Sequence, residues 1–555
     1  MTTSFERIQI LTDLLEKHQI KNVIFSPGSR NAPLVIGINS NPYFKTKVVV
    51  DERSAGFIAL GMAQELNEPV VICSTSGSAT LNYAPAICEA YYQKIPLLIL
   101  TADRPPEWIN QGEGQSINQT AIYNNYIEGS FQFPVDENPD TLWQSGRLTN
   151  EAINLTKKSN RPVHINLPFR EPLYHTTQQG SSRNKITLSK VEKSIAKKSW
   201  NEISKQWNEC SKRLIICGLN KRNNELNTIL NKLAKDEQTI ILTETTSNLM
   251  GSEFIPCIDR LLERIEGNPE FIPDLIVSIG GPIISKKLKT LFRNFNPKEH
   301  WHVNEDDNAM DVFTSLTRII PINETDFFKK IESINHYSSE GKFRELWLNE
   351  HFKARENHEK FMAKAPWSDL LAHHIIQANV PGNSNIQLGN STSVRYAQLF
   401  ETQKKLKFNS NRGVSGIDGS TSTALGAALV TDQETVLITG DLSFVYDSNA
   451  LWNNYVPKNL KLIVLNNDGG GIFNIIPGAS TSEFTQQNFV SNNPADIKSL
   501  AKAYQVNYLY ASSSEELKKQ LNILFKSNAS IILEINTKKA ANSKVLNDYF
   551  KAIKS

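Results

Sequence analysis

The chain has 555 residues, and its 60 Lys and Arg against 57 Asp and Glu give a formal net charge of +3 at pH 7. At about 100–200 residues per domain, this length predicts about three domains. So small a net charge argues against a protein that binds nucleic acid through a strongly basic surface. The five cysteines have no CxxC spacing, which argues against a disulfide framework or zinc site and favours the reducing cytoplasm. No apolar run reaches the roughly 18 residues of a membrane span.

Residues 1–178 are expected to form one α/β domain. Near-continuous apolar strands alternate there with helical patterns, as in a parallel sheet that helices cover on both faces. A polar, basic segment at about 176–198 is typical of a linker. The strands are expected at 22–28, 47–51, 69–77, 95–103 and 161–169, and two of the helices at 55–66 and 78–92.

Two further domains of the same kind are expected at 196–338 and 365–555. A charged helix at 341–364 bridges them and carries His351 and His358, which we interpret as solvated because no third metal ligand lies nearby. The predicted fold class is therefore α/β, with three consecutive parallel-sheet domains. Their strands are expected at 213–218, 238–245, 274–281 and 300–306, and then at 385–391, 435–441, 460–468 and 530–536.

Polar residues follow two neighbouring strands of the third domain, in GDLS (440–443) and NNDGGGIF (466–473). Asp441 ends one strand and Asn467 the next, and a right-handed βαβ unit puts such ends side by side. A carboxylate, an amide oxygen and a loop carbonyl suit Mg²⁺, and the glycines let backbone approach a diphosphate. Each piece alone could be a helix cap or a turn, but together they predict a metal–diphosphate site.

Glu52 stands where the apolar segment KVVV meets a helix of small and apolar residues. One interpretation is a carboxylate that the helix dipole favours. The other is a desolvated carboxylate whose raised pKa suits hydrogen bonding and proton exchange with a heterocycle nitrogen.

Arginines follow several other predicted strands. Ser29 and Arg30 lie in SPGSRNAPL, directly after the first strand, and Arg104, Arg395 and Arg412 lie in comparable positions. Single arginines are usually surface charges, but several at strand ends suggest a pocket for carboxylates.

Together these motifs resemble the thiamine-diphosphate enzymes, which have a pyrimidine-binding, a central and a diphosphate-binding domain. Their diphosphate–magnesium motif usually begins Gly-Asp-Gly, whereas this chain has Leu442 in place of the second glycine. SPGSRNAPL, DERSAGFIALGMA, LTADRPPE, NRGVSGIDG and GDLSFVYDSNAL resemble one branch, the 2-succinyl-5-enolpyruvyl-6-hydroxy-3-cyclohexene-1-carboxylate synthases of menaquinone biosynthesis. The likeness covers both terminal domains and is weak in the central one.

The resemblance implies a cofactor site for thiamine diphosphate and Mg²⁺, for which Mn²⁺ could substitute. Glu52 would hydrogen-bond the aminopyrimidine ring and promote proton removal from the thiazolium carbon, and Ile417 would bend the cofactor. Each site would form between two chains, so a homodimer or a dimer of dimers is expected. The cofactor residues would be Glu52, Ile417, Gly440, Asp441, Leu442, Ser443, Asn467, Gly469, Gly470 and Phe473, with Asp441, Asn467 and Gly469 on the metal.

The resemblance also implies a transferase reaction in which 2-oxoglutarate is decarboxylated and its succinyl unit adds to isochorismate in a 1,4 sense. Lys287 stands where related proteins have Arg. The lysine keeps the positive charge but cannot bind a carboxylate bidentately, as the guanidinium group of Arg does. The residues implied for catalysis and substrate binding are Ser29, Arg30, Arg104, Gln115, Lys286, Lys287, Asn390, Ser391, Arg395 and Arg412.

Two alternatives stay open at this point. One is another thiamine-diphosphate decarboxylase or carboligase of the acetolactate-synthase kind, which acts on pyruvate and often carries a flavin. The other is a non-enzymatic nucleotide-binding regulator, although FSPGSRNAP lacks the G-x-G-x-x-G pattern that would support it.

Overall fold

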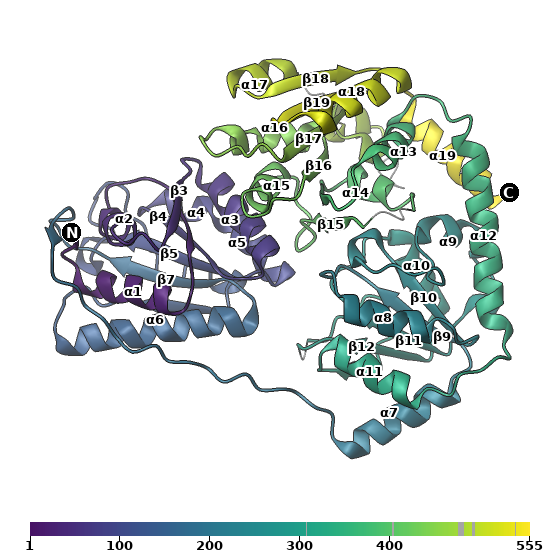
Figure 1. Cartoon of the computed structure of the whole chain (residues 1–555), viewed down its shortest axis with the longest axis horizontal. Helices are drawn as coiled ribbons and strands as arrows, with labels where there is room; N and C mark the ends of the chain where they lie inside the picture. The colour runs from purple at the N-terminus through teal and green to yellow at the C-terminus, as the bar shows by residue number, and fades with distance from the viewer. Residues whose placement is uncertain (307, 402–404, 475–481, 491–493, 539) are drawn as a thin grey trace.

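The computed structural model describes residues 1–306, 308–401, 405–474, 482–490, 494–538 and 540–555. Its described strands form three parallel sheets of six, five and six strands, and a separate antiparallel pair. Figure 1 shows the N-terminal sheet on the left, the central one at lower right and the C-terminal one above. The predicted fold class is confirmed. Among the described residues, no helix has the length and apolar character that crossing a membrane requires.

The N-terminal sheet has the order β3-β2-β4-β5-β7-β6, and all its pairings are parallel. Side chains of α1, α2 and α6 cover one face, and those of α3 and α5 cover the other. The elements are β1 (Thr2–Thr3), α1 (Glu6–Lys17), β2 (Asn22–Phe25), α2 (Ala32–Asn39), β3 (Lys45–Val48), α3 (Glu52–Leu66), β4 (Val70–Ser74), α4 (Ser78–Asn82), α5 (Ala84–Gln93), β5 (Leu97–Asp103), η1 (Pro106–Trp108), η2 (Asn124–Tyr126), β6 (Gly129–Gln132), α6 (Pro139–Ser159), β7 (Val163–Pro168) and β8 (Thr176–Thr177), which pairs with β1.

The segment expected to be a linker, 176–198, begins with β8 and runs into the start of α7. It lies along α1 and α6, where Lys17 donates to the Ser182 hydroxyl (2.7 Å) and Asn150 to the Asn184 carbonyl (3.2 Å). It then runs as a long extended stretch to the central part of the chain (Figure 1).

The central sheet has the order β10-β9-β11-β12-β13. The bridging helix α12 follows it and packs along α9 and α19 (Figure 1). Our expectation for its histidines is wrong: His351 and His358 are both buried, and His358 Nδ1 lies 2.8 Å from the Tyr549 hydroxyl. The elements are α7 (Lys197–Glu209), β9 (Arg213–Cys217), α8 (Asn224–Leu233), β10 (Thr239–Thr243), η3 (Thr245–Ser247), α9 (Ile258–Ile265), η4 (Pro269–Phe271), β11 (Leu275–Ile279), α10 (Lys286–Phe295), β12 (Glu299–Val303), β13 (Arg318–Ile320), α11 (Glu324–Ile334) and α12 (Lys342–Met362).

The C-terminal sheet has the order β15-β14-β16-β17-β19-β18, again with parallel pairings. The elements are α13 (Asp369–Asn379), β14 (Asn385–Leu388), α14 (Thr392–Ala397), β15 (Lys407–Ser410), α15 (Ser420–Ala428), β16 (Thr435–Gly440), α16 (Asp441–Tyr446), η5 (Ser448–Leu451), β17 (Leu460–Asn466), η6 (Gly471–Asn474), η8 (Thr485–Phe489), α17 (Ile497–Ala503), β18 (Asn507–Ala511), α18 (Ser514–Lys526), β19 (Ile531–Asn536) and α19 (Asn542–Lys554).

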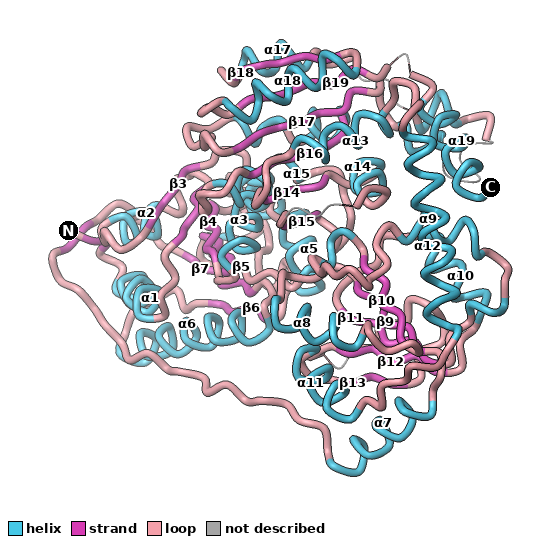
Figure 2. The backbone as a smooth tube through the Cα atoms, turned by 45° about the vertical axis from the view of Figure 1, so that its right-hand side comes forward, coloured by secondary structure: helices cyan, strands magenta, loops and turns pink. Residues whose placement is uncertain are grey.

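The two terminal sheets share one hydrophobic core, although they are far apart in the sequence. Side chains of α3 and α5 join those of α15, β16 and β17 in a single buried cluster. Figure 2 shows α3 and α15 side by side between the two sheets. Two glycines allow this approach, because a Cβ at Gly61 would overlap the Thr423 carbonyl oxygen and one at Gly426 would overlap that of Ile58.

Replacing Gly426 by alanine should therefore lower the midpoint of thermal unfolding. The added methyl group has no room, and such overpacking typically costs about 1–3 kcal/mol. Gly382→Ala is the control, since a Cβ there would meet nothing within 4 Å. Equal midpoints for the two variants would contradict the close helix contact.

Candidate active site

The structure places most of the predicted site residues at the carboxyl ends of parallel strands, where ligands of open α/β sheets bind. The N-terminal sheet presents Ser29 after β2, Glu52 after β3 and Arg104 after β5. The C-terminal sheet presents Ser391 after β14, Arg412 after β15, Asp441 after β16 and Asn467 after β17. Two details differ from our prediction: β16 ends at Gly440, so that Asp441 is already the first residue of α16, and β17 ends at Asn466, one residue before Asn467.

Glu52 is the first residue of α3 and is half-buried. Burial raises the pKa of its carboxyl group, and neighbouring Asp51 raises it further, whereas a hydrogen bond from Asn82 opposes the shift. The Asp51 side chain caps the helix by accepting from the Ser54 backbone N–H (3.2 Å). Because Asp51 and not Glu52 caps the helix, the Glu52 carboxyl group can bind a heterocycle nitrogen.

Arg30 and Arg104 form a cationic pair on the N-terminal sheet. Arg30 is buried, donates to the Phe169 carbonyl (3.1 Å) and pairs with Glu171 (3.2 Å). Burial lowers the pKa of Arg30, and the charge of Arg104 lowers it further, so the two guanidinium groups lie close enough to repel each other. Such a pair favours an anionic partner. Ser29 precedes Arg30 in the sequence and Gln115 follows Arg104, and both residues are exposed. The Gln115 backbone packs against Gly77, which follows β4.

The predicted metal end of the site has hard oxygen donors. Asp441 is 2% exposed, and its Oδ2 accepts from the Gly469 backbone N–H (2.9 Å). Asn467 follows β17 and donates through Nδ2 to Asp369 Oδ2 (2.8 Å). Among the residues that the structure describes, no cluster of three or more His, Cys, Asp or Glu could hold a metal. A cation here would therefore need a mixed set of carboxylate, amide and backbone oxygens, which suits Mg²⁺.

Space and backbone at the same strand ends fit a diphosphate. A Cβ at Gly440 would meet nothing within 4 Å, so this glycine leaves open space beside Asp441. The Ser443 hydroxyl donates to the Ile417 carbonyl (2.8 Å), which ties the start of α16 to the loop before α15. Leu442 lies on α16, Gly470 follows Gly469, and Phe473 lies in η6.

The loop between β15 and α15 is held from two sides. Asn390 donates to the Asn411 and Gly416 carbonyls (2.7 and 2.6 Å) and accepts from Arg412 (2.9 Å). On the other side Glu89, on α5 of the N-terminal sheet, accepts from three successive backbone N–H groups, those of Gly413, Val414 and Ser415 (2.6, 2.8 and 3.3 Å).

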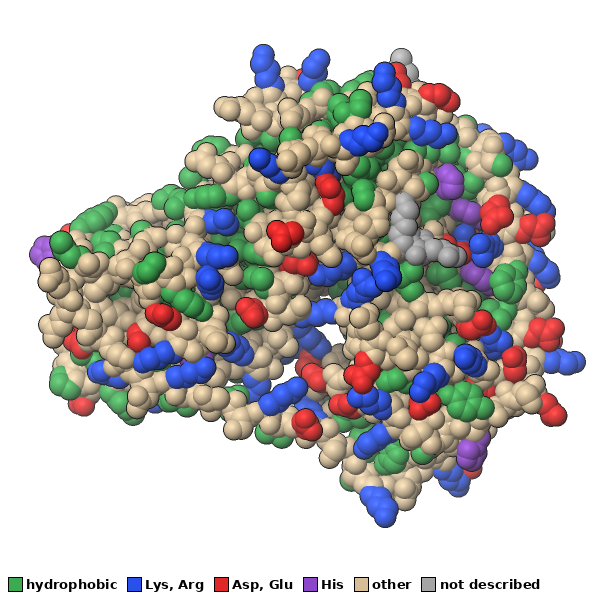
Figure 3. All heavy atoms as spheres, viewed as in Figure 1, with side chains coloured by type: hydrophobic (Ala, Val, Ile, Leu, Met, Phe, Trp, Pro, Cys, Tyr) green, Lys and Arg blue, Asp and Glu red, His purple; other side chains and the backbone are tan. Residues whose placement is uncertain are grey.

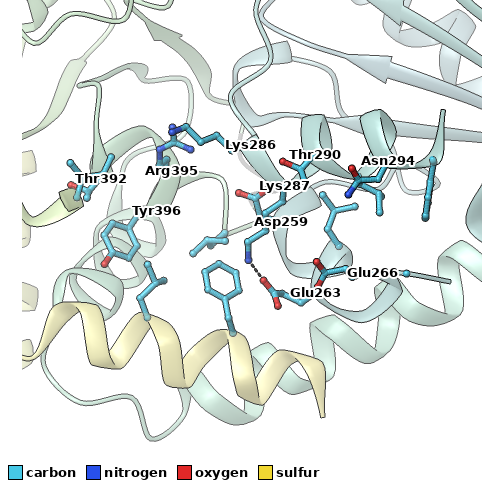
Figure 4. Close-up of a pocket in the computed structure, with 18 residues that line it drawn as sticks. Asp259, Glu263, Glu266, Lys286, Lys287, Thr290, Asn294, Thr392, Arg395 and Tyr396 are labelled. Carbon is cyan, nitrogen blue, oxygen red and sulfur yellow. Dashed lines mark hydrogen bonds and ion pairs between the residues drawn. The ribbon is translucent and has the colours of Figure 1, made fainter. Parts of the chain in front are cut away.

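A cavity of about 630 Å³ lies between the central and C-terminal sheets (Figure 4). Its lining includes Lys286, Lys287 and Arg395 from our predicted set, but not Arg30, Arg104 or Gln115. Figure 4 shows Lys286 extending toward Arg395, whereas Lys287 turns away to pair with Glu263. Lys287 also lies over the Phe550 ring (3.4 Å to its centroid), and burial lowers its pKa to about 8.

Positive charge gathers where the three sheets meet. Figure 3 shows Lys and Arg side chains around the hollow between the N-terminal, central and C-terminal parts of the chain. Arg395 lies near Arg412 and Lys289, because its charge helps to lower their pKa values in addition to the larger effect of burial. Acidic side chains lie around the same hollow (Figure 3), so the cations there are not without counter-charges.

Sequence reasoning missed three buried acids that organise these loops: Glu89, Glu244 and Asp369. Glu244 is wholly buried, and its carboxylate accepts from the Ile284 and Ser285 backbone N–H groups (2.8–2.9 Å) just before α10. Burial raises the pKa of Glu244 to about 7. No motif marks these acids, since each lies in an ordinary helical or strand-end pattern and its partners are distant in the sequence.

Comparison with known proteins extends over the whole chain. "Thiamine pyrophosphate enzyme, N-terminal TPP binding domain" matches residues 7–122, "Middle domain of thiamine pyrophosphate" matches 176–386, and "Thiamine pyrophosphate enzyme, C-terminal TPP binding domain" matches 389–535. A 2-succinyl-5-enolpyruvyl-6-hydroxy-3-cyclohexene-1-carboxylate synthase from Flavobacterium psychrophilum is 40% identical over 554 residues, which cover 98% of each chain. The chain belongs to this synthase family. The family predicted from the motifs is thereby confirmed.

Further members of the synthase family agree in length and similarity. The synthase from Flavobacterium johnsoniae is 39% identical over 551 residues (98% of each chain), and that from Christiangramia forsetii is 40% identical over 559 residues (97% of this chain and 96% of the relative). Among solved structures, benzoylformate decarboxylase from Polynucleobacter necessarius has the same fold, with a TM-score of 0.71 at 17% identity over 97% of this chain and 98% of that chain.

Replacing Glu89 by glutamine should loosen the loop that carries Arg412. A hydrogen bond to a charged group contributes about 1.5–3 kcal/mol, and the amide of glutamine would turn an N–H group toward the loop's own N–H donors. Amide hydrogen exchange at residues 413–415 should then speed up about tenfold or more, as measured by mass spectrometry.

Glu65→Gln is the matched control for this exchange measurement. Glu65 also joins the two terminal sheets, through Lys407 (2.7 Å) and Asn385 (2.9 Å), but it does not contact the loop. If exchange at 413–415 were unchanged in Glu89→Gln, or equally faster in Glu65→Gln, Glu89 would not hold the loop.

Proposed function

We propose that this protein decarboxylates 2-oxoglutarate with thiamine diphosphate and adds the succinyl unit to isochorismate by 1,4-addition. The products would be 2-succinyl-5-enolpyruvyl-6-hydroxy-3-cyclohexene-1-carboxylate, an intermediate of menaquinone biosynthesis, and carbon dioxide. The observation that carries the proposal is the full-length identity of about 40% to synthases of that name. We also propose the cytoplasm as its location, which the five free cysteines support.

In this proposal Glu52 binds the pyrimidine ring of the cofactor. When bound, thiamine diphosphate supplies the electron sink that lets a 2-oxoacid lose carbon dioxide. Partial burial at the start of α3 raises the pKa of the Glu52 carboxyl group. That environment favours a strong hydrogen bond to a ring nitrogen and exchange of a proton with it.

The other end of the cofactor would lie on the C-terminal sheet. Asp441, the side-chain oxygen of Asn467 and the backbone oxygen of Gly469 would hold Mg²⁺ or Mn²⁺, which in turn binds the diphosphate. The open space beside Gly440 and the buried Asp441 support this assignment. The remaining cofactor contacts would come from Ile417, Leu442, Ser443, Gly470 and Phe473.

The substrates would be held through their carboxylates. Arg30, Arg104 and Gln115 would approach from the N-terminal sheet, and Arg395 and Arg412 from the C-terminal sheet. Ser29, Lys286, Lys287, Asn390 and Ser391 complete the proposed set. Two dicarboxylic substrates fit the local excess of cations better than pyruvate does, because each cationic pair can bind one carboxylate group.

The central sheet favours this synthase over a flavin-dependent relative or a nucleotide-binding regulator. Nucleotides bind open α/β sheets through backbone N–H groups at strand ends and helix N-termini. In the central sheet, carboxylates of the chain itself already accept hydrogen bonds from such backbone N–H groups. Glu244 accepts from Ile284 and Ser285, and Glu324 accepts from Gly280 (2.8 Å). A phosphate at these positions would have to displace a buried acid.

We further propose that two chains complete each site. Within one chain, Arg53, the residue after Glu52, donates to the Tyr446 carbonyl (2.8 Å). Tyr446 ends α16, whereas Asp441 begins it. The segments next to this contact carry exposed apolar side chains, with Val48 47%, Tyr446 54% and Trp452 54% exposed. A second copy of the chain would cover them and bring its own Glu52 to the site, in a homodimer or a dimer of dimers.

A coupled assay with 2-oxoglutarate and isochorismate tests the proposed function. Carbon dioxide and the succinylated product should form only when thiamine diphosphate and Mg²⁺ are both present. Pyruvate in place of 2-oxoglutarate should give little turnover. Preference for pyruvate, or turnover without thiamine diphosphate, would contradict the assignment.

Replacing Glu52 by glutamine should leave the fold intact and lower turnover by about 10²–10⁴-fold, the usual contribution of a general acid–base group. In the wild type, the acid limb of kcat/KM should lie above pH 4.5, the ordinary pKa of a glutamate, because burial raises that pKa. Activity is expected to fall as the pH drops through this raised value, because the carboxylate becomes protonated. A variant with normal turnover would remove Glu52 from the mechanism.

A further inference from the structure

The orientation of the Asn467 side chain decides whether it can bind a cation. An asparagine amide offers an oxygen acceptor on one side and an NH₂ donor on the other, and only the oxygen can ligate a metal. Its hydrogen-bond partners therefore determine which atom faces the proposed ion, since the amide can turn by 180° within nearly the same volume.

Asp369 fixes this orientation. Its Oδ2 accepts from Asn467 Nδ2 (2.8 Å), and its Oδ1 accepts from the Thr537 hydroxyl (2.6 Å). The Asp369 side chain is only 2% exposed, so water does not compete for these positions. Because a carboxylate accepts and does not donate, Nδ2 of Asn467 stays on the Asp369 side and Oδ1 is turned away from it.

Asp369 is itself held by two neighbouring segments. Its backbone N–H donates to the Asn542 side chain (2.9 Å), at the start of α19. Thr537, which donates to its carboxylate, also donates through its backbone N–H to the Asn466 carbonyl (2.9 Å), the residue before Asn467. The start of α13 and the ends of β17 and β19 thus form one clamp around a single carboxylate.

We propose that Asp369 is a positioning residue for the divalent cation: it holds Asn467 with the amide oxygen facing the ion that Asp441 also binds. This inference rests on the proposed function, which places an ion at that position. Asp369 acts through Asn467 in this proposal, so its loss should weaken metal binding rather than abolish it. Outer groups that orient metal ligands typically contribute about 10–100-fold in affinity.

The test is the binding of Mn²⁺ to the full-length protein in the presence of thiamine diphosphate, with free Mn²⁺ measured by electron paramagnetic resonance. We expect Asp369→Ala to raise the Mn²⁺ dissociation constant about 10–100-fold. Activity should recover when excess Mn²⁺ is added. If Asp369→Ala does not fold, the Mn²⁺ dissociation constant is measured for Asp369→Ser instead. The serine side chain keeps a polar group at the helix start but is too short to reach Asn467.

Glu534→Ala is the matched control. Glu534, on β19, is also buried, and it accepts from Asn466 Nδ2 (2.6 Å) and the Tyr508 hydroxyl (2.6 Å). Its loss disturbs the residue next to Asn467 without freeing the Asn467 amide, so the Mn²⁺ dissociation constant should stay within about twofold.

Two results would overturn the role of Asp369: an unchanged dissociation constant in its variants, or an equal increase in Glu534→Ala. A wild-type protein that binds no Mn²⁺ with thiamine diphosphate would instead contradict the proposed ion site, and with it the proposed function.

Discussion

The contact between α3 and α15 is the constraint on which the rest of the site depends. These helices come from opposite ends of the chain, yet Gly61 and Gly426 let their backbones touch and join two sheets in one core. A glycine inside a helix costs roughly 0.5–1 kcal/mol relative to alanine. Here that cost is offset by the apolar surface that close packing removes from water.

The same contact determines what lies at the helix starts. Glu52 begins α3, and the loop with Arg412 and Ile417 leads into α15. Glu89 on the neighbouring α5 then holds that loop through three backbone N–H groups. A similar arrangement occurs around Glu244 and Asp369, where buried carboxylates fix the segments that carry Lys286 and Asn467. Internal acids thus position the proposed site, and three of the cations around it, Arg30, Arg104 and Lys287, each pair with a carboxylate of the chain.

Much of the fold could be predicted from the sequence, and the failures share a physical cause. The central strands of each sheet are buried on both faces, so they appear as continuous apolar runs and were found. In the three parallel sheets, the missed strands β6, β13, β15 and β18 all lie at sheet edges. Each is short or partly exposed and contains polar residues, as in GSFQ and KFNS, so no apolar run marks it.

The proposed site was only partly accessible to sequence reasoning. Residues such as Glu52 and Asp441 stand out because polar groups follow apolar strands within a few positions. Glu89 and Asp369 do not, because their partners lie 324 and 98 residues away in the sequence. The histidines of α12 were misjudged for a similar reason: His358 is covered by α19, nearly 200 residues later. Long-range packing decides burial, and local patterns do not record it.

The central claim is that Glu52 of one chain and Asp441 of another act on a single cofactor. Mixed dimers test it most directly, with Glu52→Gln in one differently tagged chain and Asp441→Ala in the other. Both parent homodimers should be nearly inactive, whereas the purified mixed dimer should regain about half of the wild-type activity, because one of its two sites contains neither substitution. A mixed dimer as inactive as its parents would contradict the account.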